Sequence, residues 1–144
     1  MNNDVYRKLD KIAEGKILTE FLRNNGQECW QRIVNTAPKD TGRYASSIQI
    51  TDVERRGNEI SIEIYTDLNS GWHDVPLAEF LEHGTGIFRE DGTGRQTPWV
   101  YYNERWKRFV FTRGQKPQPH WSPAYFTQIA KIREGLKHVF DERL

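Results

Sequence analysis

The chain has 144 residues, the size of one ordinary domain. Hydrophobic residues make up 36%, enough for one core, yet no run approaches the roughly 18 apolar residues of a membrane-spanning helix. The 21 basic and 20 acidic residues nearly cancel, so the overall basic excess of a duplex-DNA-binding protein is missing. The single cysteine, Cys29, cannot form an internal disulfide, and we expect it to pack as a small apolar side chain in a reducing compartment.

Apolar residues recur at helical spacing from Val5 to Ala37. They predict a long helix over residues 4–36, or a pair of helices broken near Gly26. Pro38 disfavours a helical conformation at the residue before it and therefore ends the helix. Beyond it, an Asx-turn and a glycine that tolerates positive φ predict a rigid corner that leads into a strand. The corner residues are Pro38, Asp40, Thr41 and Gly42.

Two segments with alternating polar and β-branched residues follow, at residues 46–51 and 60–65. Arg56-Gly57-Asn58 lies between them and supplies a turn, so the two segments predict a hairpin. Pro76 then opens a short helix over residues 77–81, which ends at Gly84. Residues 84–97 are rich in glycine and lack a core pattern, and they predict an exposed, flexible loop.

Two runs of aromatic and β-branched residues, at 99–102 and 109–112, predict a second hairpin. Ser122 is a good N-cap and Pro123 suits a first helical position, so a last helix is expected over roughly residues 123–141. The whole chain, residues 1–144, then forms a single α+β domain. We expect an antiparallel or mixed sheet of about four strands, packed by a long amino-terminal helix, a short middle helix and a carboxy-terminal helix.

Residue patterns for catalysis or cofactor binding are weak. Glu79, Glu82 and His83 cluster, with Glu79 and His83 on one helical face, and could in principle hold a metal ion. A second histidine at zinc-site spacing is missing, so a solvated charged face is favoured. The glycine-rich loop lacks the Gly-Lys-Ser/Thr triplet of a phosphate-binding loop. Cys29 lies inside a helix with no histidine nearby. The sequence therefore predicts no enzymatic activity, no metal and no cofactor.

Basic and aromatic residues alternate over residues 105–116, which include Arg105, Trp106 and Lys107. Such a cluster could stack on single-stranded nucleic acid, and a nucleic-acid-binding module is the alternative function. Basic residues that protect the edge of a strand pair, or a protein contact, are favoured because Glu104 and the neutral overall charge dilute the cluster.

Several segments of the chain follow one another in the order typical of a known family. They are "TAPKDTGRYASSI", "LAEFLEHGTG", "TPWVYY" and "TRGQKPQPHWSPAY". Together they resemble the gene-product-ten-like tail-component family of long-tailed, siphovirus-type bacteriophages and prophages. The resemblance spans roughly residues 30–130 and includes the spacing of the segments as well as their order.

The resemblance implies a structural protein of the virion at the head–tail junction, of the kind called head–tail joining, neck or tail-completion protein. Such proteins cap the tail tube and dock it to the connector of the head, in a ring of six subunits. The implied partners are the tail tube protein, the head-completion or connector protein and further copies of the chain, with no membrane and no specific nucleic acid. The implied location is the virion, after assembly in the host cytoplasm.

Subunits of a ring contact one another through two different surfaces. We expect the loop at 84–97 to become ordered when such contacts form. Five residues in and near this loop and the second hairpin are the candidates for subunit contacts: Phe88, Arg89, Arg95, Trp99 and Trp106.

Overall fold

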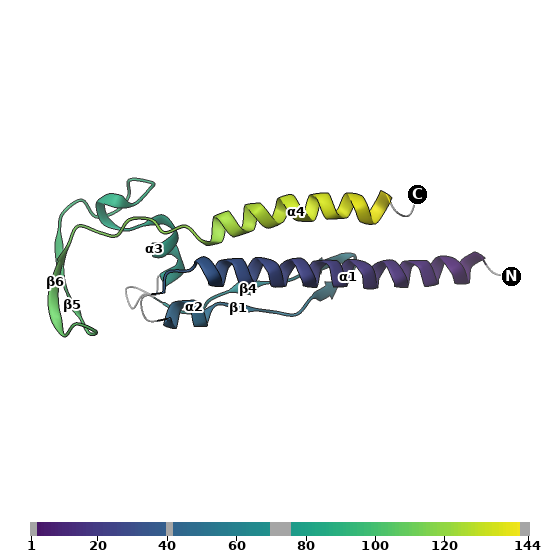
Figure 1. Cartoon of the computed structure of the whole chain (residues 1–144), viewed down its shortest axis with the longest axis horizontal. Coiled ribbons are helices and arrows are strands. Elements are labelled where there is room, and N and C mark those ends of the chain that lie inside the picture. The colour runs from purple at the N-terminus through teal and green to yellow at the C-terminus, as the bar shows by residue number, and fades with distance from the viewer. Residues whose placement is uncertain (1–2, 40–41, 70–75, 142–144) are drawn as a thin grey trace.

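The computed structural model describes residues 3–39, 42–69 and 76–141. Two long helices, α1 (Asn3–Thr36) and α4 (Trp121–Asp141), run side by side in opposite directions, and both chain ends lie at the same end of the molecule (Figure 1). A hairpin of β5 (Trp99–Asn103) and β6 (Arg108–Thr112) lies at the other end. No helix of the described residues is long and apolar enough to cross a membrane.

Helix α1 is continuous, so the alternative with a break near Gly26 is wrong. Gly26 is buried, and a Cβ atom placed on it would lie 2.6 Å from Cδ1 of Ile62. This glycine therefore serves a close approach between the helix and the neighbouring strand segment rather than a bend. The helix ends at Thr36, immediately before Ala37-Pro38, as the proline predicts.

The corner after α1 is followed by one helical turn before the strand begins. Gly42 has φ of 76°, in the left-handed region, as predicted for the corner, whereas Asp40 and Thr41 lie outside the described residues. The turn is α2 (Arg43–Ser47), and the hydroxyl of Ser46 donates to the carbonyl of Gly42 over 2.7 Å. Such side-chain-to-backbone bonds favour a turn over a strand, so the strand expected from residue 46 starts only at residue 49.

The first hairpin is long and interrupted. At the open end of the hairpin, β1 (Gln49–Ile50) pairs with β4 (Ile64–Tyr65). Next to the turn, β2 (Glu54–Arg56) pairs with β3 (Glu59–Ser61). Between these two ladders, residues 51–53 lie opposite residues 62–63, so three residues of one strand face two of the other, as in a β-bulge.

The α+β class and the antiparallel pairing are confirmed. Within the described part of the chain, however, the strands form three separate two-stranded ladders instead of one sheet of about four. The predicted turn of the first hairpin is confirmed at Gly57, with φ of 61°.

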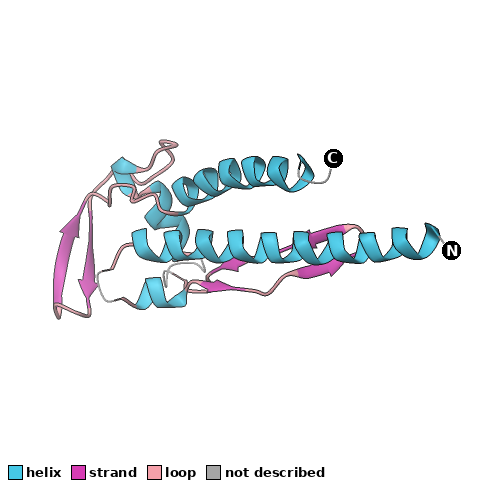
Figure 2. Cartoon of the chain, turned by 45° about the vertical axis from the view of Figure 1, so that its right-hand side comes forward, coloured by secondary structure: helices cyan, strands magenta, loops and turns pink. Residues whose placement is uncertain are grey.

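The elements form layers around α1, which lies between α4 on one side and the β1–β4 ladder on the other (Figure 2). Short helix α3 (Leu77–His83) packs beneath the start of α4 and is followed by a 3-10 turn, η1 (Gly86–Phe88). The pattern predicted this short helix and its end at Gly84 correctly. The core gathers where α1, α2, α3 and α4 meet, and its buried apolar residues are Cys29, Ile33, Ala37, Tyr44, Ala45, Ile48, Leu81 and Ala124.

The start of α4 is capped by a distant side chain, which corrects the N-cap predicted at Ser122. The Glu82 carboxylate of α3 accepts the backbone N–H groups of His120 at 2.8 Å, Trp121 at 3.0 Å and Ser122 at 2.8 Å. Burial raises the pKa of Glu82, but these N–H donors outweigh it and lower the pKa to about 2. An ionised carboxylate thus satisfies the free N–H groups of the helix start and joins α3 to α4.

Candidate assembly surface

The base of the β5–β6 hairpin is held by a close crossing of two backbone segments. The N–H of Thr85 donates to the carbonyl of Gln115 over 2.9 Å, and the N–H of Ile87 donates to that of Arg113 over 3.1 Å. A Cβ atom on Gly86 would lie 2.0 Å from the carbonyl oxygen of Arg113, and one on Gly114 would lie 2.1 Å from that of Thr85. Glycine is therefore required at both positions, and the crossing fixes where the hairpin starts and ends.

The crossing includes the first residues of the glycine-rich segment 84–97. Gly84 and Gly86 are buried, whereas residues 90–93 and 95–98 are exposed. The predicted flexibility of the segment 84–97 stays a prediction.

One face of the hairpin carries only large apolar and aromatic side chains. In the register of the two strands, Val100 lies opposite Phe111 and Tyr102 lies opposite Phe109, so all four point to the same side. The exposed fractions are 60% for Val100, 45% for Tyr102, 73% for Phe109 and 65% for Phe111. We call these four residues the aromatic face. A contiguous apolar patch of this kind on a protein surface indicates an interaction site.

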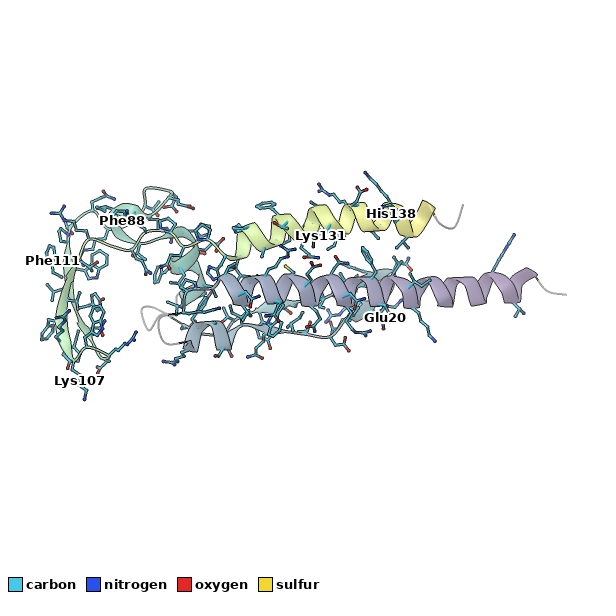
Figure 3. The ribbon with its side chains drawn as sticks, viewed as in Figure 1. Glu20, Phe88, Lys107, Phe111, Lys131 and His138 are labelled. Carbon is cyan, nitrogen blue, oxygen red and sulfur yellow. The ribbon has the colours of Figure 1, made fainter. Side chains whose placement is uncertain are left out.

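The hairpin receives little support from the rest of the molecule. It stands out as an arm, with Lys107 at its free tip and Phe111 along β6 (Figure 3). At the tip, the Arg108 guanidinium lies 5.2 Å from the centre of the Trp106 ring. An isolated two-stranded hairpin is marginally stable in water, so an arm of this composition gains stability when another surface covers it.

A second open apolar surface lies along the helices. It is a groove of about 590 Å³ across α1, between the residues that join β3 to β4 and the first turns of α4. Gly26 and Cys29 lie on its α1 side, and Ile62 lines it from the strand segment. Tyr125 and Phe126 of α4 also line it, with 56% and 68% of their surfaces exposed. We call this feature the helix groove.

The helix groove contains one polar group without a partner. Gln128 is only 2% exposed, and its Nε2 donates to Oδ1 of Asn25 at 2.7 Å and to Glu28 at 3.1 Å. Its Oε1 is buried and accepts no hydrogen bond among the described residues. The Glu28 carboxylate also pairs with Lys131 of α4, and this contact, followed by those from Gln128 and Arg32, lowers the pKa of Glu28 to about 2. The lining of the groove is therefore mainly apolar, and Oε1 of Gln128 is an unpaired acceptor that its own chain closes off from solvent.

The five predicted contact residues lie in η1, in the loop after it and in the β5–β6 hairpin. Arg89 is engaged within its own chain, since its guanidinium bonds Glu79 at 2.7 Å and its side chain is 17% exposed. Arg95 lies 5.5 Å over the Trp99 ring at the base of the hairpin. Phe88 belongs to η1, with the Lys116 ammonium 5.9 Å from its ring centre, and Trp106 is 54% exposed at the tip. Their role as subunit contacts stays a prediction.

Sequence reasoning missed the aromatic face. Its signal was present in the alternation along each strand, combined with a register in which the aromatic positions of the two strands coincide. The alternation alone does not show exposure, because a strand that is apolar on both faces is typical of a buried one.

The candidate metal ligands have other partners. Glu79 pairs with Arg89, Glu82 caps α4, and Nδ1 of His83 lies 3.1 Å from Glu90. Among the described residues, no group of three potential ligands comes together. The cluster is accounted for as a set of structural contacts.

A comparison with protein families matches residues 3–84 to the family described as "Bacteriophage HK97-gp10, putative tail-component". The match covers more than half of the chain and includes α1, the first hairpin and α3, while the β5–β6 hairpin lies beyond it. No curated protein and no solved structure matches the chain. With the fold class as expected, the family match shows that this chain belongs to the HK97-gp10-like family of bacteriophage tail components.

Proposed function

We propose that the protein is a non-enzymatic tail-completion component at the head–tail junction of the virion. In this role it caps the tail tube and docks the tube to the connector of the head, as one subunit of a ring of six. Its partners are the tail tube protein, the head-completion or connector protein and other copies of itself. It reaches this place from the host cytoplasm during assembly.

The observation that carries the proposal is the aromatic face. Four large apolar side chains lie exposed on an arm that projects from the end of the molecule. Covering them with another protein removes apolar area from water, and this favours association. A tail component with an exposed apolar surface on a projecting arm is suited to contact with its neighbours in a particle.

The same geometry disfavours the alternative of a nucleic-acid-binding module. Single-stranded nucleic acid is held by aromatic side chains set in a basic groove. The aromatic face contains no charged residue, and the pair of Trp106 with Arg108 lies at the tip, outside this face. Binding to DNA in a gel-shift assay, with an affinity that falls steeply as salt rises, would support the alternative instead.

Removal of the protein from an otherwise complete phage tests the proposed function. We expect filled heads and finished tails that remain separate in electron micrographs, and restoration of joined particles when the protein is supplied from a plasmid. Joined, infectious particles in its absence would contradict the role.

A further inference from the structure

We infer that the aromatic face of one copy of the chain docks into the helix groove of the next copy. This inference rests on the proposed function, because it names the contact that would build the ring. Both surfaces are open and apolar in the single chain, and they belong to different parts of it: the projecting hairpin, and the middle of the α1–α4 pair. A contact between two different surfaces repeats from copy to copy and closes into a ring when the rotation permits.

The two surfaces match in polarity. The aromatic face offers apolar side chains and a single hydrogen-bond donor, the hydroxyl of Tyr102. The helix groove offers a lining made mainly of apolar side chains, with Glu63 as its charged residue. The apolar side chains of the hairpin therefore meet a mainly apolar lining, and their burial favours association.

Their charges are complementary at the margins. The tip of the hairpin carries Lys107 and Arg108, and neither makes an ion pair among the described residues. Glu63 lines the groove, and its carboxylate has no cationic partner among the described residues. Placing a basic tip beside this carboxylate favours one docking direction and disfavours the contact of two hairpins, whose like charges repel.

The exposed apolar area of the aromatic face indicates how strong the contact between two copies is. Three aromatic side chains at these exposures present roughly 400 Å² of apolar surface, given about 150–250 Å² for each side chain. A stable interface buries about 800 Å² on each partner. The contact alone is therefore weak, and we expect the isolated protein to self-associate only at high concentration.

Photo-crosslinking tests the inference on the full chain. The substitution Phe109→p-benzoylphenylalanine places a reactive group in the centre of the aromatic face. A mixture of isotope-labelled and unlabelled protein at up to about 1 mM, the range of weak affinities, identifies crosslinks between copies. We expect mixed-isotope crosslinks from residue 109 to the α1 segment 22–33 or the α4 segment 121–132.

A matched pair of variants on α4 provides the second measurement. Phe126→Lys places a charge in the helix groove, whereas Thr127→Lys places the same charge on the next exposed residue, outside the groove. We expect Phe126→Lys to reduce the crosslinked yield at least tenfold and Thr127→Lys to leave it within twofold. Circular dichroism and thermal unfolding check that both variants remain folded.

Three results would overturn the inference: no crosslink between copies at the highest concentration, crosslinks confined to hairpin against hairpin, or equal yields for the two lysine variants. None of them touches the proposed function, because a hairpin that docks on a tail or head protein still joins head to tail. Conversely, if joined particles form in the absence of the protein, the proposed function is contradicted. The crosslinking result would then still describe how isolated chains associate.

Discussion

The carboxylate of Glu82 accepts the backbone N–H of Trp121, the first residue of α4, over 3.0 Å. The two residues are 39 positions apart, and the chain between them forms the whole β5–β6 hairpin. The cap therefore closes a loop whose free end is the projecting arm. Together with the glycine crossing at Gly86 and Gly114, it holds the base of the arm against the helical body.

Removal of this cap destabilises the fold. Glu82→Ala leaves three backbone N–H groups at the start of α4 without their acceptor, and each bond to a charged group contributes about 1.5–3 kcal/mol. Because these bonds share one carboxylate, we expect the free energy of unfolding to fall by about 3–4 kcal/mol, measured by urea denaturation at pH 7. Glu79→Ala, at the more exposed pair with Arg89, is the control and should cost less than about 1 kcal/mol. Equal losses in the two variants would contradict the role of Glu82 as a cap.

Acid weakens the same contact. The folded-state pKa of Glu82 is about 2, below the ordinary 4.5, so its contribution is complete above pH 4.5 and declines as the pH falls toward 2. Between pH 7 and pH 3 the contribution should fall by about 2 kcal/mol, from 1.36 kcal/mol per pKa unit. Glu82→Gln cannot titrate and should lack this part of the acid sensitivity. Denaturation curves of both proteins at the two pH values measure the difference; parallel losses would argue against the depressed pKa.

A buried hydrogen-bond chain joins α2 to the start of α4. The Trp121 indole N–H donates to the Tyr44 hydroxyl over 2.8 Å, and that hydroxyl lies 2.6 Å from Nε2 of His120. Nδ1 of His120 lies 2.8 Å from the carbonyl of Gln118, and because a carbonyl oxygen only accepts, Nδ1 is the donor of this bond. Tyr44→Phe leaves both ring partners unpaired, and we expect a loss of about 2 kcal/mol in the free energy of unfolding.

The control for this substitution is Tyr65→Phe, because the Tyr65 hydroxyl bonds Gln49 on the surface. We expect a change below about 0.5 kcal/mol there. Tyr44→Phe with a change as small as this would show that the buried chain adds little to stability.

The glycine crossing makes a further prediction about the base of the arm. Gly86 and Gly92 both have positive φ, 62° and 72°, but a Cβ meets backbone only at Gly86. Gly92→Ala should cost about 1–2 kcal/mol from the backbone conformation alone. Gly86→Ala adds a clash with Arg113 and should cost at least about 2 kcal/mol more, seen as a lower Tm. If the Gly86→Ala variant is no less stable than the Gly92→Ala variant, the backbone around Gly86 does not contact the backbone around Arg113, and the crossing is contradicted.

Local patterns predicted the elements that depend on local physics. The helical spacing in α1, its end before Pro38 and the turn at Gly57 follow from rules that act over a few residues. The cap at Glu82 and the contact of Gly86 with Arg113 join residues far apart in sequence, so neither periodicity nor propensity could reveal them. Gly26 was ambiguous for the same reason: a glycine in a helix weakens it unless a neighbour, here Ile62, requires the space.

The candidate surface was predicted only in part. The basic and aromatic composition of the second hairpin made a protein contact one of the favoured interpretations, and Trp106 is 54% exposed there. The sequence could not decide between a strand pair buried on both faces and one left open, because both have the same apolar pattern. The choice depends on what covers the hairpin, and its own chain leaves Phe109 73% exposed.

The central claim is that the aromatic face serves assembly and not folding. The most direct measurement compares Phe109→Lys with Tyr101→Lys, on the opposite face of the same strand pair, in particle assembly and in thermal unfolding. We predict that Phe109→Lys keeps the Tm within a few degrees and abolishes joined, infectious particles. The yield of joined particles should be higher with Tyr101→Lys than with Phe109→Lys. Normal yields of joined particles with Phe109→Lys would contradict the account.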